Sequence, residues 1–126
     1  MSAPNIVMIV ADDLGYADLG AYGCSDYATP HLDRLAAEGV RFTQAYANAP
    51  LCTNTRVALI TGRYQYRFTL GLTEPLRHPD RQRPGMGLPP EHRTLPALLR
   101  DAGYATALIG KWHLGALPRF GPLKSG

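Results

Sequence analysis

Three short polar stretches of the sequence hold the side chains whose types and spacing could do chemistry. In the first stretch, Asp12 and Asp13 directly follow an apolar run, and adjacent carboxylates repel each other unless a cation or several donors compensate. Hard divalent metal ions prefer such oxygen ligands, although two carboxylates fill only part of a Ca²⁺ shell of about six to eight oxygens. The pair indicates either a metal site completed from elsewhere or a loop with one capping and one solvated carboxylate.

The second stretch, LCTNTRVALITGR, places Cys52 and Arg56 four residues apart. On a helix, these side chains share a face one turn apart. A helix N-terminus attracts anions and favours a thiolate, and the arginine adds a fixed positive charge. This spacing suits a nucleophile that attacks an anionic ester, while a half-buried, inert thiol is the alternative.

In the third stretch, Lys111 and His113 stand on either side of Trp112. In an extended segment, alternate side chains project to the same side, so the lysine and the histidine would face one site together. Such a pair could stabilise transition-state charge and move protons to a leaving group. A lone histidine or lysine at the end of a strand is usually structural or solvated, so the functional interpretation depends on the convergence of the three stretches.

Each polar stretch lies just beyond a segment with the pattern of a buried strand. Residues 6–11 form a continuous apolar, β-branched run, and residues 40–47 and 104–110 are the second and third expected strands. Strands that alternate with helices predict a doubly wound α/β domain with a mainly parallel sheet and flanking helices. Because ligands bind beyond the carboxyl ends of such strands, we expect the three polar stretches to converge on one edge of the sheet.

Helices are expected between the strands, over residues 30–38, 53–60 and 95–102. Capping residues and glycines set these limits, since a polar N-cap begins a helix and glycine ends it. The first helix is limited by Thr29, Pro30 and Gly39, and its inner face would consist of Leu32, Leu35 and Ala36. Gly62 would end the second helix, and the third would begin after Thr94 and end at Gly103. A long loop is expected from about residue 64 to residue 92.

The amino-acid composition narrows the kinds of molecule and metal ion that the protein is expected to bind. Eleven of the thirteen basic residues are arginines, whose planar side chains suit bidentate contacts with oxyanions. The densest basic stretch, residues 77–85, contains an aspartate, two prolines and no aromatic residue, which is typical of a surface loop rather than of a nucleic-acid site. Cys24 and Cys52 are too few for a disulfide framework and fit no zinc signature.

The length of the chain indicates how many domains it could form, and its first residues indicate where in the cell it is expected. With 126 residues, of which 45% are hydrophobic, the chain could bury one modest core. It opens without a basic segment or a small-residue cleavage site, and the apolar run at residues 6–11 is too short to cross a bilayer. We therefore expect no membrane span and a cytoplasmic protein as written, or a periplasmic or secreted one if a signal peptide has been removed.

Four stretches, in this order, resemble the N-terminal part of the sulfatases, a family of the alkaline-phosphatase-like superfamily. The family's opening strand and metal loop resemble PNIVMIVADDLGYADLGAYG, and its first helix and second strand resemble TPHLDRLAAEGVRFTQAYA. Its first signature resembles LCTNTRVALITGR, and its second resembles GYATALIGKWHLG. The resemblance spans most of residues 4–115 and implies that residues 1–126 are an incomplete N-terminal portion of a catalytic domain, which needs the remainder of that domain.

The resemblance implies metal-assisted covalent catalysis. Asp12, Asp13 and the residue at position 52 would hold a divalent metal ion, usually Ca²⁺, with Mn²⁺ or Mg²⁺ as alternatives. Cys52 would be oxidised to formylglycine, whose hydrated aldehyde attacks sulfur, expels the alcohol and then ejects sulfate. Asn54 stands where the family's Cys-x-Pro-x-Arg core has proline, so the conversion of Cys52 is left open.

The resemblance also assigns the remaining polar residues. Arg56 would hold the hydrated nucleophile, Lys111 would contact sulfate oxygens, and His113 would assist the diol chemistry. The implied function is a sulfuric ester hydrolase (a sulfatase) acting on a small-molecule sulfate ester. A phosphonate or phosphate ester hydrolase of the same superfamily and a non-catalytic anion-binding module are the alternatives. The candidate wall residues of a substrate site are Tyr64, Tyr66 and Arg67.

Overall fold

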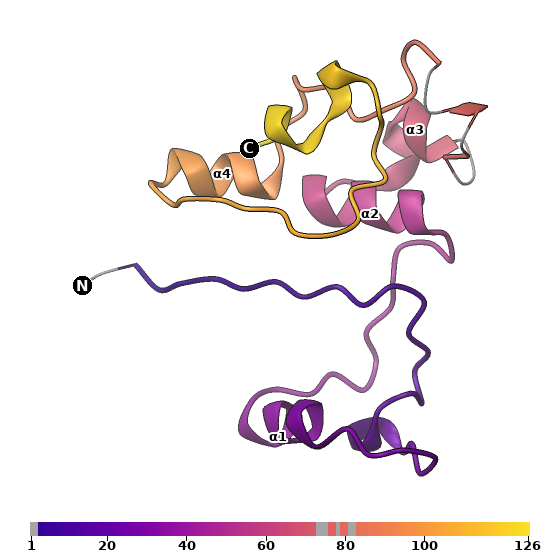
Figure 1. The fold of residues 1–126 in the computed structure, drawn as a ribbon, viewed down its shortest axis with the longest axis vertical. Helices are drawn as coiled ribbons and strands as arrows, with labels where there is room; N and C mark the ends of the chain where they lie inside the picture. Colours follow the sequence, from indigo (N-terminus) through magenta and orange to yellow (C-terminus); the bar gives the residue numbers. More distant parts are fainter. Residues whose placement is uncertain (1–2, 73–75, 78, 81–82) are drawn as a thin grey trace. The chain divides into compact units, whose positions relative to one another are not determined.

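The computed structural model describes residues 3–72, 76–77, 79–80 and 83–126. The chain divides into two compact units, a first unit of Met1–Ala45 and a second unit of Tyr46–Gly126. Figure 1 traces the chain through both units. In the described part of the chain, none of the helices has the length and apolar character needed to span a membrane.

The first unit contains a short 3₁₀-helix, η1 (Gly20–Tyr22), and an α-helix, α1 (Pro30–Glu38). The predicted limits of α1 are confirmed, since Thr29 precedes the helix and Gly39 follows it. The carboxylate of Asp33 accepts hydrogen bonds from the Ala21 N–H at 2.6 Å and from the Thr29 hydroxyl at 2.9 Å. These bonds tie α1 to η1.

The expected inner face of α1 is exposed in the first unit. Leu32 and Leu35 are 46% and 64% exposed, and the described residues of this unit include no buried hydrophobic side chain. The polar side chain of Asp33, rather than an apolar stripe, joins the helix to its neighbour. The prediction of the helix was right, whereas the prediction of its buried face is not met within this unit.

The three expected strands are absent from the described residues, where the structure differs from the predicted parallel sheet. Residues 6–11, 40–47 and 104–110 are irregular segments (Figure 1). A strand exists only when a second backbone satisfies its N–H and C=O groups. The apolar side chains are correspondingly uncovered, since Val7 and Ile9 are each 83% exposed.

The second unit is helical in its described part. Its helices are α2 (Cys52–Thr61), η2 (Gln65–Arg67), α3 (Thr69–Leu72), α4 (Leu95–Asp101), η4 (Pro118–Phe120) and η5 (Pro122–Lys124). Two predicted helices are confirmed: α2 ends at Gly62, whose φ is 62°, and Thr94 caps α4 by accepting from the Ala97 N–H at 3.3 Å. By contrast, η2 and α3 lie inside the expected loop of residues 64–92.

The core of the second unit packs against α2 and α3. Its buried members are Val57, Phe68, Leu70, Leu76, Met86, Leu88 and Leu114, with Ile60 and Trp112 packed against them. The indole N–H of Trp112 donates to the Phe120 carbonyl at 2.8 Å. Trp112 therefore anchors the segment that carries Lys111 and His113.

A buried polar contact joins the first turn of α2 to α3. The Asn54 side chain is 0% exposed, and its Nδ2 donates to the Gly71 carbonyl at 2.8 Å. A Cβ at Gly71 would lie 1.9 Å from the backbone oxygen of Gln65, so this approach requires glycine. Asn54 thus has a structural role at the position where the resemblance implies proline.

Candidate active site

Cys52 is the first residue of α2, and its side chain is half-buried. Leu51 precedes it as the N-cap and makes no side-chain hydrogen bond to the helix. The N–H groups of a first helical turn have no partners within the helix, and together they favour an anion or a thiolate. Cys52 therefore lies where the sequence predicted a nucleophile.

The imidazole of His113 lies against Cys52. Its Nδ1 is 3.2 Å from the Cys52 Sγ, although the two residues are 61 positions apart in the sequence. Its Nε2 is 2.9 Å from the Leu76 carbonyl oxygen. Because a carbonyl only accepts hydrogen bonds, Nε2 carries a proton, so that the ring in its neutral form presents an unprotonated Nδ1 to the sulfur. The three residues have the geometry of a nucleophile, its base and an orienting group.

Arg56 contacts the same segment one turn further along α2. Its Nη1 donates to the backbone carbonyl of Lys111 at 2.6 Å. Residues four apart on a helix share one face, so Cys52 and Arg56 bring that face of α2 against residues 111–113. Four of the six candidate residues in the three polar stretches are thus neighbours in the second unit, namely Cys52, Arg56, Lys111 and His113.

A pocket of about 250 Å³ opens beside His113. Its lining residues are Leu76, Lys111, Trp112, His113, Gly115 and Ala116. A cationic side chain and an imidazole at the wall of one pocket suit an anionic ligand. The candidate wall residues Tyr64, Tyr66 and Arg67 are exposed and lie outside the lining of this pocket.

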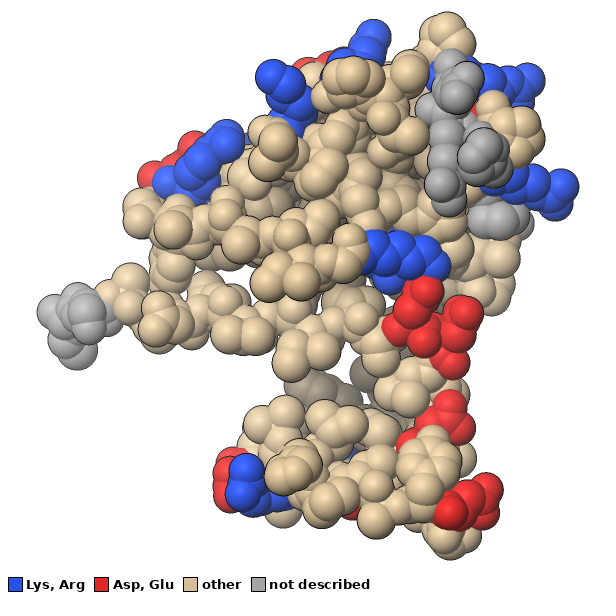
Figure 2. Space-filling model, viewed as in Figure 1, with Lys and Arg blue, Asp and Glu red and all other residues tan. Residues whose placement is uncertain are grey.

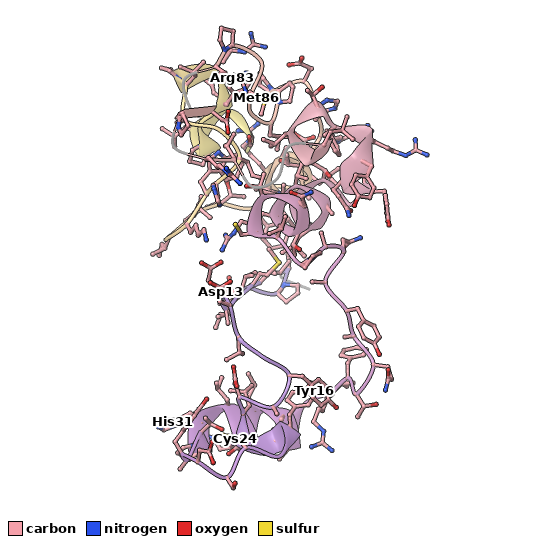
Figure 3. All side chains as sticks on the ribbon, turned by 90° about the vertical axis from the view of Figure 1, so that its right-hand side faces the viewer. Asp13, Tyr16, Cys24, His31, Arg83 and Met86 are labelled. Atoms are coloured by element: carbon pink, nitrogen blue, oxygen red, sulfur yellow. The ribbon has the colours of Figure 1, made fainter. Side chains whose placement is uncertain are left out.

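Asp12 and Asp13 belong to the first unit, so their predicted convergence with the Cys52 site stays a prediction. Asp13 has a left-handed backbone with φ of 57°, and its side chain can be followed in Figure 3. Two adjacent carboxylates are hard oxygen donors and fit part of a Ca²⁺ shell. Across the described ranges, no group of three or more His, Cys, Asp and Glu side chains comes together to hold a metal ion.

Two contacts of His113 were not predicted from the sequence. Leu76 is an apolar residue within the expected loop of residues 64–92, and only the fold brings its carbonyl to the imidazole. Thr53 directly follows Cys52, is 0% exposed, and hydrogen-bonds to the backbones of both His113 and Leu76. The sequence could have drawn attention to Thr53, because its hydroxyl stands next to the candidate nucleophile. It could not have indicated the Leu76 carbonyl, because every residue has a backbone carbonyl.

Comparison with known proteins relates this geometry to a family. A family model described as Sulfatase matches residues 4–126. The steryl-sulfatase of Mus musculus is 53% identical over 112 residues, which cover 89% of this chain and 18% of that protein. The N-acetylgalactosamine-6-sulfatase of Canis lupus familiaris is 45% identical over 127 residues, which cover 98% of this chain and 24% of that protein. The chain thus spans less than a quarter of the length of these relatives.

Solved structures show the same similarity in three dimensions. A crystal structure of Ps i-CgsB matches with a TM-score of 0.81 and 42% identity, covering 96% of this chain and 26% of that chain. A crystal structure of Ps i-CgsB in complex with k-i-k-neocarrahexaose matches with a TM-score of 0.80 and 39% identity, covering 91% of this chain and 24% of that one. The backbone of this chain therefore follows the corresponding part of these structures.

Proposed function

The chain belongs to the sulfatase family, and from this premise we propose that the protein is a sulfuric ester hydrolase whose nucleophile stands at position 52. The names of curated relatives at 45% and 53% identity support hydrolysis of a sulfate ester. Those names include a steryl-sulfatase and an N-acetylgalactosamine-6-sulfatase. The proposal is therefore limited to what the names share, an organic sulfate ester as the substrate.

The single observation that carries the proposal is the 3.2 Å contact between the Cys52 Sγ and the His113 Nδ1. With Nε2 bound to the Leu76 carbonyl, Nδ1 is the ring atom that accepts a proton. As the side chain at position 52 attacks the ester sulfur, its proton passes to Nδ1 and the bond from sulfur to the alcohol oxygen breaks. Nδ1 then returns the proton to the departing alcohol oxygen. A nucleophile and base at hydrogen-bond distance are the minimum that covalent ester hydrolysis requires.

Cationic side chains would meet the charge of the sulfate group. Lys111 lines the pocket beside His113, and the Arg56 guanidinium is fixed by its bond to the Lys111 carbonyl. A guanidinium is planar and carries its donors in a rigid fork, which suits the oxygens of a tetrahedral anion. Both charges would stabilise negative charge that develops during the attack.

Two further groups belong to the proposal, a modified Cys52 and a divalent cation. Conversion of Cys52 to formylglycine would supply a hydrated aldehyde as the attacking group, and a bound cation would supply Lewis acidity. Asp12 and Asp13 would hold the cation, and their hard oxygen atoms favour Ca²⁺. If Cys52 is not converted, its thiol is the group that His113 contacts.

We also propose that residues 6–11, 40–47 and 104–110 become strands of a mainly parallel sheet in the complete catalytic domain. The side chains of Ile9 and Ile109 are 83% and 96% exposed in the described structure. A parallel sheet covered on both faces buries such apolar runs. The TM-score of 0.81 to a solved structure supports the course of the backbone that this sheet needs.

Sulfate release from an aryl sulfate, measured with the full protein, tests the proposed function. The Cys52→Ala variant should lose sulfate release, because the nucleophile is removed. The Cys24→Ala variant is the matched control, since Cys24 is also a free, partly buried cysteine, and it should keep the activity. Faster hydrolysis of the matched aryl phosphate would favour a phosphatase, and undiminished sulfate release by Cys52→Ala would overturn the proposal.

A further inference from the structure

His113 has a backbone conformation that is unusual for a residue other than glycine. Its φ is 58°, and among the described residues Asp13 is the other non-glycine with a positive φ. A side chain in the left-handed region costs free energy, so the surrounding contacts must hold the residue there. The same contacts determine the direction of the imidazole, because the ring is attached to this constrained backbone.

The hydroxyl of Thr53 is one of these contacts. It donates to the His113 carbonyl at 3.3 Å and accepts from the Leu76 N–H at 3.3 Å. A hydroxyl has one proton to donate. Because a carbonyl can only accept and an N–H can only donate, the Thr53 proton must point to the His113 carbonyl. The side chain is 0% exposed, so water does not compete for either bond.

These bonds complete a ring of contacts around the imidazole. Leu76 is bound at both ends, because its N–H donates to Thr53 while its carbonyl accepts from the His113 Nε2 at 2.9 Å. Thr53 in turn donates to the backbone carbonyl of His113, the residue that carries the imidazole, and this bond closes the ring. A displacement of any member changes the position of the next one.

We propose that Thr53 is a positioning residue that keeps His113 in the Nε2–H tautomer, with the unprotonated Nδ1 directed at the side chain of position 52. This inference deepens and rests on the proposed function, because a positioned base matters only if position 52 is a nucleophile. Thr53 and Cys52 are consecutive residues in the first turn of α2. One helical turn therefore fixes both the nucleophile and, through Leu76, its base.

A purely structural role for Thr53 makes a different prediction. A buried hydroxyl with two bonds stabilises the fold, and its removal would lower stability without changing the His113 tautomer in the molecules that remain folded. A positioning role predicts a change in the tautomer and in kcat, with little change in KM. These readouts separate the two roles.

The experiment compares Thr53→Val with Thr53→Ser in the full protein, since valine removes the hydroxyl and serine keeps it. The control is Thr69→Val, which makes the same change at an exposed threonine of α3. Kinetics on an aryl sulfate give kcat and KM, and ¹⁵N chemical shifts of the His113 ring report the tautomer. If Thr53→Val fails to fold, Thr53→Ala and Thr53→Ser form the second pair that differs by a hydroxyl.

The inference predicts that the valine variant loses the pure Nε2–H signal and that its kcat falls roughly tenfold or more. The serine variant should recover most of the kcat, and Thr69→Val should match the unaltered protein. An unchanged tautomer and kcat in folded Thr53→Val would overturn the inference. If the unaltered protein releases no sulfate, the proposed function fails, and the tautomer of the variants alone then decides the positioning role.

Discussion

Replacing Asn54 by proline would restore the Cys-x-Pro-x-Arg core of the sulfatase family and remove a buried hydrogen bond at the same time. In the structure, Asn54 is the third residue of α2, and its Nδ2 donates to the Gly71 carbonyl at 2.8 Å. The backbone tolerates proline in a first helical turn, because the N–H groups there have no intrahelical partner. The side-chain donor to Gly71, however, is lost.

The expected cost follows from the burial of Asn54, which is 0% exposed. A buried carbonyl left without its donor costs about 1–3 kcal/mol of stability. The rigidity of proline in the unfolded chain offsets about 0.4–1 kcal/mol of this cost. Taking the middle of each range, the net destabilisation by Asn54→Pro is about 1.3 kcal/mol, and the midpoint of urea unfolding falls by about 0.7 M for a slope of about 2 kcal/mol/M.

Urea unfolding and peptide mass spectrometry measure the two effects of Asn54→Pro separately. We expect a lower midpoint together with a larger fraction of formylglycine at position 52, because the restored core matches the family pattern. Asn54→Ala is the matched control, since it removes the same donor without restoring the core and should lower stability without raising conversion. Equal midpoints for the unaltered protein and both variants would refute the hydrogen-bond argument, and equal conversion would refute the role of the motif.

Three further predictions concern packing, charge and metal. Gly71→Ala should lower the free energy of unfolding by about 3 kcal/mol or more, because its Cβ would lie 1.9 Å from a backbone oxygen. The control is Gly121→Ala, whose Cβ would lie 3.6 Å from the nearest atom, and this variant should have the melting temperature of the unaltered protein. Arg56→Lys should lower kcat/KM for an aryl sulfate about tenfold or more, since lysine lacks the planar fork. Chelation should abolish sulfate release, Ca²⁺ should restore it, and Asp13→Asn should need more Ca²⁺ for the same rate, as a calcium titration of activity would show.

The helices could be predicted from local signals. Thr29 and Gly39 limit α1, and Thr94 and Gly62 limit α4 and α2, because capping depends on residue type at single positions. The short helices η2 and α3 could not be predicted, because three or four residues are too few to show a helical period. The expected strands depend on a partner backbone, which the described residues do not provide.

Part of the candidate site could likewise be predicted from residue spacing, and part is set only by the tertiary structure. Spacing alone indicated that Cys52 and Arg56 share a helix face, and the structure brings both against the segment of Lys111 and His113. The carbonyl of Leu76 could not be inferred, because every residue has a carbonyl and only tertiary structure selects one. The convergence of the acidic pair with this site stays a prediction.

The central claim is that the side chain at position 52, converted to formylglycine and held against His113, is the nucleophile of a sulfate ester hydrolase. The most direct measurement is the mass of the peptide of residues 50–63, isolated from protein that releases sulfate. The account predicts a mass that corresponds to an aldehyde at position 52 in the active fraction. An unmodified thiol throughout protein that remains fully active would contradict it.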